Sequence, residues 1–150
     1  ENVTLEELAG LQVFIDSMFE NLYEDEGIGL AATQLNVQKN IVVMDMSAKG
    51  HEQMVLVNPQ ILNSRGTEIS YEGCLSVPGI YEKVIRAGEI EVSALDRFGQ
   101  PMTLTAEGRL AVCIQHELDH LQGQLFIDRL PALKRKMVLK RLEKINQRRY

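Results

Sequence analysis

The sequence contains no run of apolar residues long enough to cross a lipid bilayer. The stretch "NIVVMDM" at residues 40–46 has the length of a β-strand, far short of the roughly 20 residues of a spanning helix. The first ten residues, "ENVTLEELAG", are acidic and polar, and they lack the apolar region of a secretory signal peptide. From these two absences we expect no membrane partner and a cytoplasmic location.

Cysteines are few, and repeats and linkers are absent. The two cysteines are Cys74 and Cys113, and without an export signal we expect reduced thiols rather than a disulfide. No internal repeat, low-complexity segment or Pro- or Gly-rich linker interrupts the chain, so residues 1–150 are predicted to form a single domain. We also expect the protein to be a monomer.

Negative charge predominates except at one end of the chain. The formal net charge is −5, but residues 131–150 carry eight Lys or Arg and one Glu, so this segment is about +7 and the remainder about −12. A mostly acidic chain is a poor general nucleic-acid binder, and we therefore predict no DNA partner. The basic end is either a solvated helix face or a surface that docks on the ribosome, and the sequence leaves both interpretations open.

The N-terminal part of the sequence predicts an amphipathic helix. In "TLEE" at residues 4–7, Thr4 is a candidate N-cap and Glu7 completes a capping box. The helix should end before Gly27. Apolar residues recur at steps of three and four and should pack on a core: Leu8, Leu11, Ile15, Met18 and Leu22.

Between residues 40 and 105 the pattern changes to short β-rich runs. The runs are "IVVMD", "MVLVN", "EISYEG", "EIEVSALD" and "MTLT", and turn signals such as "NP", "RAGE" and "DRFGQP" separate them. A second helix should start near residues 105–107 and stop at Gly123, and its apolar residues on nearly every side predict burial. A basic helix should follow at about residues 132–148. The predicted fold is α+β, with antiparallel or mixed sheets packed around a buried central helix.

That buried helix carries an HExxH motif in "CIQHELDHLQG" at residues 113–123. Residues four apart on a helix face the same way, so His116 and His120 can chelate one metal ion. Glu117 lies beside His116, where its carboxylate can reach a metal-bound water as a general base must. Val112 and Cys113 lie one turn earlier and should form part of the wall near the metal. Satisfied core histidines are the alternative, but this spacing favours a metal.

Two histidines leave the third metal ligand to be found. The candidates are Cys74, Cys113, His51 and various carboxylates. His51 lies in the polar stretch "SAKGHEQ" and is expected to be a solvated surface residue. Cys113 would crowd the two histidines of the same helix and is better explained as a small core residue. Cys74 lies in "YEGCLSVPG", an irregular strand end, where a buried structural cysteine remains the alternative.

Three segments together resemble the motifs of a known family. "GIGLAATQ" at 27–34, "EGCLSVP" at 72–78 and "QHELDHLQG" at 115–123 are similar, in order and spacing, to the three motifs of the peptide deformylases. The resemblance extends from the first helix to the basic last helix. It implies a metal-dependent hydrolase of protein biosynthesis that removes the N-formyl group from formyl-Met nascent peptides and releases formate.

The resemblance also implies roles for individual residues. By this match the metal ligands are Cys74, His116 and His120. Glu117 would act as general base and then as general acid, while metal-bound hydroxide attacks the formyl carbon. The side chain of Gln34 and the backbone N–H of Leu75 would stabilise the oxyanion.

Substrate contacts follow from the same match. The positions expected to bind the peptide are Ile28, Gly29, Glu72, Gly73, Val112 and Cys113. Without a side chain, Gly29 lets the backbone pair with the peptide like an added strand, and Ile28 would help to line the methionine pocket. Glu72 and Arg86 match positions that pair as a salt bridge. Asp119 either orients the metal site or forms an ordinary helix-surface ion pair.

Two arguments about the metal disagree. Ligand softness and an open site favour zinc for two histidines and one cysteine. The bacterial members of the family work with ferrous iron, accept nickel and are much less active with zinc. We therefore expect one Fe²⁺, for which Ni²⁺ or Zn²⁺ can substitute. A thiolate beside Fe²⁺ should make the enzyme oxygen-sensitive.

Two residues depart from the family pattern. Thr33 stands where many members have proline, and Arg109 where a pocket-lining apolar residue is common. We expect Arg109 to widen the pocket mouth or to favour acidic residues further along the substrate.

Two other functions compete with this one. A zinc peptidase that cuts internal bonds would give "EGCLSVPG" no role. A non-catalytic homologue would need neither Glu117 nor Gln34.

Overall fold

The structure, a computed structural model, describes residues 1–150 except 48, 75–76, 124–131, 134–135, 138 and 141–150, with the backbone alone at 72–74 and 77–82. Its helices are α1 (Leu5–Ala9), α2 (Gln12–Glu24), the 3₁₀ helix η1 (Ala32–Leu35) and α3 (Gly108–Leu121). Its strands are β1 (Gly29–Ala31), β2 (Ile41–Asp45), β3 (Gln53–Arg65), β4 (Glu68–Cys74), β5 (Val77–Arg86), β6 (Glu89–Leu95) and β7 (Pro101–Glu107).

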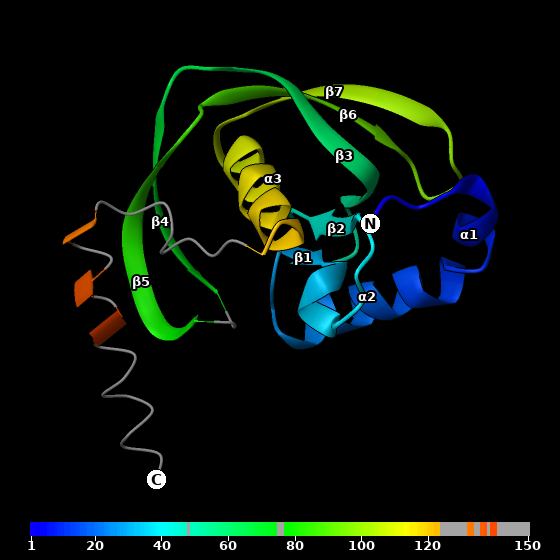
Figure 1. Ribbon diagram of the computed structural model, residues 1–150, viewed down its shortest axis with the longest axis horizontal. Coiled ribbons are helices and arrows are strands. Elements are labelled where there is room, and N and C mark those ends of the chain that lie inside the picture. The colour runs from blue at the N-terminus through cyan, green and yellow to red at the C-terminus, as the bar shows by residue number, and fades with distance from the viewer. Residues whose placement is uncertain (48, 75–76, 124–131, 134–135, 138, 141–150) are drawn as a thin grey trace, which may run out of the picture.

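The strands form two antiparallel sheets. Five strands pair in the order β1-β2-β3-β6-β7, and β4 pairs with β5 in a separate hairpin. Figure 1 shows α3 between this hairpin and strands β1 and β2. The prediction of an α+β fold with antiparallel sheets is confirmed.

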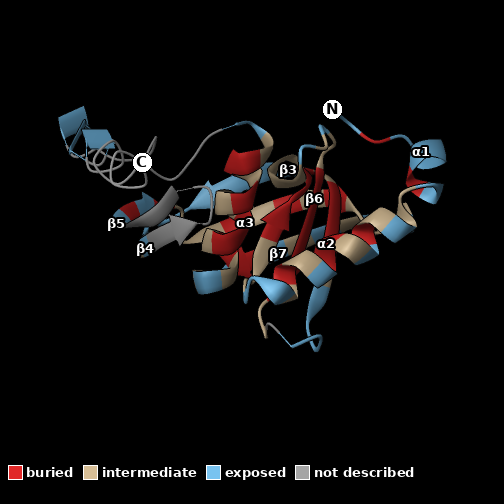
Figure 2. Cartoon of the chain, turned by 90° about the horizontal axis from the view of Figure 1, so that it is seen from below, coloured by how far each residue is buried: buried red, intermediate tan, exposed pale blue. Residues whose placement is uncertain are grey.

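The core lies on both faces of the five-stranded sheet, and β2 shows why. All five residues of β2 are buried, and successive side chains of a strand point to opposite faces. Ile41 and Val43 pack in a cluster with α2, whereas Val42 and Met44 pack in a second cluster with α3. Figure 2 shows the buried residues concentrated on the strands and on the helix surfaces that face them. The sheet is thus covered by α2 on one face and by α3 on the other.

The N-terminal helix is interrupted where the sequence predicted continuity. Thr4 is the N-cap as expected, since its side chain accepts a hydrogen bond of 3.1 Å from the backbone N–H of Glu7. However, α1 ends at Ala9, Gly10 caps it, and a new helix begins at Gln12. The apolar spacing continues across this break because both helices pack on the same core cluster.

Strand β3 passes through the "NP" dipeptide that was predicted to be a turn. β3 runs from Gln53 to Arg65, and its pairing with β6 shifts between Val57 and Gln60. Asn58 at this shift has a φ of 53°, which is typical of a bulge and not of a chain reversal. The long bent strand therefore pairs with β2 at one end and with β6 along the rest.

Helix α3 follows β7 directly and carries the HExxH motif. It begins at Gly108, and Gly123 has a φ of 76° just beyond its end, as predicted for a left-handed cap. Its sides are not buried equally: Ala111 and Ile114 are fully buried, whereas His116 is half-buried and Arg109 is exposed. The expectation of burial on every side is therefore too strong, because one side of the helix faces an accessible space.

The basic C-terminal helix falls mostly outside the described residues. Residues 132–133, 136–137 and 139–140 are helical and exposed, and the rest of the predicted segment 132–148 is not described. Within the described parts of the chain, no helix is both long enough and apolar enough to span a membrane.

Candidate metal centre and active site

The two histidines of α3 converge on one point. The Nε2 atoms of His116 and His120 lie 3.1 Å apart, and the two rings meet edge to face. Ligands about 2.0–2.1 Å from a shared ion in a tetrahedral shell lie about 3.3 Å from one another. The separation therefore fits two adjacent ligands of one metal ion, and imidazole nitrogens are donors that Zn²⁺ and Fe²⁺ both accept.

Glu117 completes this group from the same helix. Its Oε1 lies 4.0 Å from His116 Nε2, and its side chain is only 5% exposed. Together His116, Glu117 and His120 are the one group of potential metal ligands found among the described residues. A carboxylate this close to the histidines, yet beyond bonding distance of His116, is placed to act on a water or substrate proton.

Strand β1 passes against this helix at Gly29. A Cβ atom at Gly29 would lie 3.0 Å from Cys113 Sγ and 3.0 Å from Glu117 Cγ. Such distances are tighter than most real Cβ contacts, so a side chain at this position would have to push its neighbours on α3 by a few tenths of an ångström. Figure 1 shows β1 beside the end of α3 that carries the motif. The backbone of Gly29 thus lies against α3, and β1 is an edge strand of the described sheet. The expected pairing of Gly29 with a peptide stays a prediction.

Gln34 lies on η1, directly after β1. Its Oε1 accepts a hydrogen bond of 2.9 Å from the backbone N–H of Ala31, so the Nε2 end of the amide is the donating end. The neighbouring Thr33 donates a hydrogen bond of 2.9 Å to the carbonyl of His120. These bonds tie η1, the helix that carries Gln34, to both β1 and the last turn of α3, although the sequence separates η1 from His120 by more than 80 residues.

Asp119 is buried, so the expectation that it forms an ordinary ion pair on the helix surface is wrong. Its Oδ2 lies 2.9 Å from Nη1 of Arg86 on β5, and both side chains are more than 90% buried. The pair joins the β4–β5 hairpin to α3 and lines a cavity of about 750 Å³ between α3, β3 and β5, which His116 and Glu117 do not line. The expected partner of Arg86, the Glu72 side chain, lies outside the described side chains.

The remaining predicted residues divide into those near the group and those not described. Ile28, directly before β1, is half-buried. On α3, Val112 is half-buried and Cys113 is 7% exposed. The backbone of Gly73 and Cys74 ends β4, and Cys74 pairs with Val77 in the hairpin. The Cys74 side chain and the whole of Leu75 lie outside the described residues.

The position of His51, the candidate ligand that was expected to be a surface residue, agrees with that expectation. His51 is exposed in the loop after β2, as expected of a surface residue.

Asp45 is a buried carboxylate that the sequence analysis did not single out. It is fully buried at the end of β2 and accepts hydrogen bonds from the Tyr23 hydroxyl at 2.7 Å and the Gly50 N–H at 2.7 Å. Burial alone raises the pKa of Asp45, but its hydrogen bonds, those from Ser47 and Tyr23 foremost, outweigh this and lower the pKa to about 2. Its backbone N–H donates to the carbonyl of Ile28 at 2.9 Å. Asp45 therefore supports the segment that enters β1.

The fold and the paired histidines together define a class of protein. An antiparallel α+β protein with two histidines and a glutamate converging on a helix beside an edge strand is typical of a metal-dependent hydrolase.

Comparison with known proteins places the chain within that class. The family model described as Polypeptide deformylase matches residues 1–136. A peptide deformylase of Pseudoalteromonas translucida is 54% identical over 134 residues, which cover 89% of this chain and 80% of the relative. The chain belongs to this family, and its enzyme class is peptide deformylase, a hydrolase. The resemblance seen in the three motifs is confirmed.

Solved structures agree with this assignment. The crystal structure of a peptide deformylase from Legionella pneumophila superposes with a TM-score of 0.89 at 46% identity, covering 99% of this chain and 88% of that one. A peptide deformylase from Synechococcus elongatus, solved in complex with actinonin, gives a TM-score of 0.86 at 40% identity over 94% of this chain and 78% of its own. Metal dependence is typical of the family, in agreement with the His116–Glu117–His120 group.

Proposed function

We propose that this chain hydrolyses the N-formyl group of formyl-Met nascent peptides with the residues of α3, η1 and β4. The observation that carries the proposal is the convergence of His116, Glu117 and His120 beside the edge strand at Gly29. In this proposal residues 1–150 act as one catalytic domain, and α3 is the central helix around which the sheets are arranged.

The metal ion is held by three side chains from two elements. The proposed ligands are Cys74 at the end of β4 and His116 and His120 on α3, and the donor set of one thiolate and two imidazoles fits Fe²⁺, Ni²⁺ or Zn²⁺. A bound divalent cation lowers the pKa of a coordinated water toward neutrality and so supplies hydroxide at pH 7. We propose Fe²⁺ as the working metal, following the bacterial family members.

Glu117 moves the protons of the reaction. Its buried carboxylate accepts a proton from the attacking water and later donates one to the departing amine. The formyl oxygen gains negative charge as the carbon becomes tetrahedral. The Nε2 amide of Gln34 and the backbone N–H of Leu75 donate hydrogen bonds to that oxygen, and losing one such donor typically costs on the order of 100- to 1,000-fold in rate.

The peptide itself binds along the edge of the sheet. The backbone of Gly29 and Gly73 pairs with the peptide as an added strand, because β1 has a free edge in the described sheet and Gly29 carries no side chain. Apolar side chains line the methionine pocket, and the proposed set is Ile28, Val112 and Cys113, with Glu72 at its border. Arg109, exposed at the start of α3, lies at the pocket mouth and favours acidic residues further along the peptide.

The cellular setting follows from the proposed substrate and from the charge of the C-terminal segment. Newly made proteins carry formyl-methionine where they are synthesised, so the proposed location is the cytoplasm. The basic segment 131–150 docks on the ribosome, whose RNA is anionic, and the enzyme works as a monomer.

Formate release tests the proposed reaction. Protein loaded with Fe²⁺ or Ni²⁺ without oxygen should release formate from a formyl-Met-Ala-Ser peptide, and it should not release acetate from the matched acetyl-Met-Ala-Ser peptide. Actinonin, which is bound in the Synechococcus elongatus relative, should abolish the release. Cleavage of internal peptide bonds, or equal hydrolysis of the two acyl groups, would instead support a peptidase or a general amidase. Activity that survives days of aerobic storage without reductant would contradict the choice of Fe²⁺.

A further inference from the structure

The hydroxyl of Thr33 connects η1 to the last turn of α3. It donates a hydrogen bond of 2.9 Å to the backbone carbonyl of His120, a residue 87 positions later in the chain. His120 lies in the last turn of α3, and its carbonyl also accepts a hydrogen bond of 3.1 Å from the backbone N–H of Gly123. The Thr33 bond is therefore the second bond to this carbonyl, and it ties the backbone of one of the two converging histidines to η1.

Local hydrogen bonds hold η1 itself in a defined conformation. The Ala31 N–H donates to Gln34 Oε1 at 2.9 Å, which closes the turn between β1 and η1. At the other end, Asn36 has a φ of 62°, and its N–H donates to the carbonyl of Thr33 at 3.2 Å. The Val37 N–H donates to Ala32 at 3.2 Å. A short unit held in this way moves as one body, so a bond at Thr33 also sets the place of Gln34.

We propose that Thr33 is a positioning residue that holds Gln34 and His120 at a fixed distance from one another. The hydroxyl orients the His120 backbone, and through it the imidazole, while Gln34, the next residue along the chain, is held by its own bond to Ala31. Oxyanion stabilisation depends strongly on the placement of the donor relative to the reacting group. The inference rests on the proposed roles of Gln34 and His120, and it gives a function to a hydroxyl that the family motif alone leaves unexplained.

Three variants separate the hydroxyl from the shape of the side chain. Thr33→Val keeps the shape and removes the donor, Thr33→Ser keeps the donor, and Thr103→Val is the matched control at an exposed position of β7. Each protein is titrated with Co²⁺, followed by visible absorption of the bound ion, and is assayed for formate release. Thr33→Val should weaken Co²⁺ binding about tenfold and lower kcat about tenfold, with KM changed less than about twofold. Thr33→Ser and Thr103→Val should remain close to wild type.

Each outcome decides the proposal. Wild-type Co²⁺ affinity and kcat in folded Thr33→Val would overturn it, and so would equal losses in Thr33→Val and Thr33→Ser, because the hydroxyl would then not be the cause. If Thr33→Val does not fold, Thr33→Ala replaces it. This variant removes the donor without adding the second methyl group that valine introduces, and it is judged by the same criteria. If wild-type protein binds Co²⁺ but no metal form releases formate, the proposed reaction fails, while the Co²⁺ affinities still decide the role of Thr33.

Discussion

Gly29 is the position at which the main chain comes closest to the candidate catalytic group. Its missing side chain leaves room for Glu117 and Cys113, which an added Cβ atom would meet at 3.0 Å. The contact is with the carboxylate stem of Glu117, and Glu117 Cδ would lie 3.2 Å away. A side chain here would therefore press on Cys113 and on the proposed general base, which would have to shift by a few tenths of an ångström.

Gly29→Ala should separate binding of the metal from catalysis. Because the new methyl group pushes Glu117 by only a few tenths of an ångström, we expect kcat for formate release to fall about tenfold, less than the ~100-fold typical of a 1 Å misplacement. The metal content, measured by atomic absorption, should remain that of wild type. Gly10→Ala is the matched control, since its Cβ would meet nothing closer than the Glu7 carbonyl at 3.5 Å. A folded Gly29→Ala protein with wild-type kcat would contradict the described packing.

Asp45 makes the fold sensitive to acid. Its pKa of about 2 in the folded protein is below the ordinary value of 3.8. A carboxyl group with a lowered pKa stabilises the folded state above its unfolded pKa, and this contribution is lost as the pH falls toward the folded pKa. The window for Asp45 therefore lies between about pH 4 and about pH 2.

Asp45→Asn should remove this acid dependence. We expect a lower urea midpoint at pH 7, because the backbone N–H groups of Gly50 and Ser47 lose a charged acceptor, and a shallower fall between pH 4 and pH 2 than in wild type. Asp25→Asn, at an exposed site, is the control and should follow the wild-type curve. Parallel curves for wild type and Asp45→Asn would show that another carboxyl group causes the acid sensitivity.

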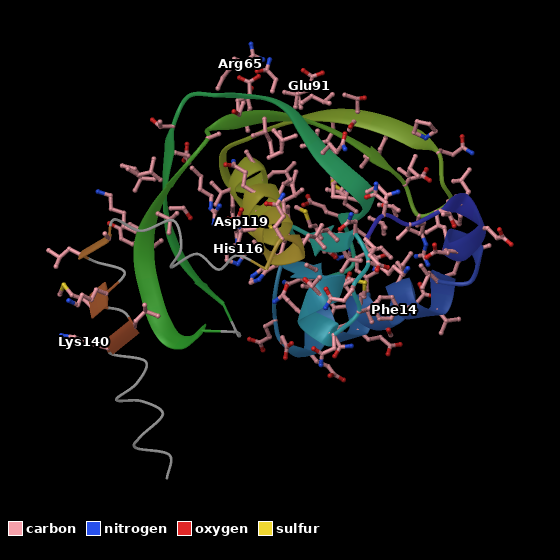
Figure 3. All side chains as sticks on the ribbon, viewed as in Figure 1. Phe14, Arg65, Glu91, His116, Asp119 and Lys140 are labelled. Atoms are coloured by element: carbon pink, nitrogen blue, oxygen red, sulfur yellow. The ribbon has the colours of Figure 1, made fainter. Side chains whose placement is uncertain are left out.

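At the scale of elements, the Arg86–Asp119 pair joins the β4–β5 hairpin to α3. Both partners are buried, so each neutralises a charge that would otherwise lie in the protein interior. The hairpin also carries Cys74, the proposed third metal ligand, at the end of β4, whereas the two proposed histidine ligands lie on α3. Figure 3 shows Asp119 and His116 near the same end of α3. The pair therefore connects the two elements that carry the proposed metal ligands.

Removing one partner of this pair should destabilise the fold strongly. Asp119→Ala removes one buried, charged hydrogen-bond partner of Arg86, and we expect a loss of about 1.5–3 kcal/mol in the free energy of unfolding. The control is Glu89→Ala, which breaks the exposed Arg65–Glu89 pair and should cost less than about 1 kcal/mol. Urea unfolding of the metal-free proteins measures both. Similar losses in the two variants would contradict the distinction between a buried and an exposed pair.

Some elements could be predicted from the sequence and others could not. β2 was predicted residue for residue, because "IVVMD" is a continuous apolar run that both faces of the sheet bury. β5 was missed because Pro78, Gly79 and its charged residues interrupt the pattern, and its place depends on pairing with β4. β1 has only three residues and exists through its pairing with β2. Gly10 divided the first helix, and the apolar spacing did not reveal this.

The candidate site divides in the same way. His116, Glu117 and His120 share one helix, so their spacing alone brings them together. The contacts between Gly29 and Glu117, Thr33 and His120, and Asp45 and Ile28 join segments that only the fold brings together, and their residue types are ordinary. Cys74 was one of several candidate ligands in the sequence until the family resemblance selected it, and its side chain lies outside what the structure describes.

For the whole molecule, the uneven charge has a testable consequence. Lys136 and Lys140 are exposed on the helical residues that follow α3, and Figure 3 shows Lys140 far from the labelled site residues. The double variant Lys136→Glu with Lys140→Glu should bind ribosomes at least about tenfold more weakly at low salt, with a shallower salt dependence, measured by co-sedimentation. Lys49→Glu with Lys83→Glu changes the same charge elsewhere and should bind like wild type. Equal binding of both double variants would favour a solvated helix face.

The central claim is that a metal site on α3, with Glu117 as its proton carrier, removes the formyl group. The most direct test is formate release from a formyl-Met peptide by wild type and by Glu117→Gln, both loaded with Ni²⁺ and with metal content measured on the same samples. We predict rapid release by wild type and a fall of about 100- to 10,000-fold in Glu117→Gln at equal metal content. Formate release by metal-loaded Glu117→Gln at the wild-type rate would contradict the role of Glu117. No release by metal-loaded wild type would contradict the proposed reaction.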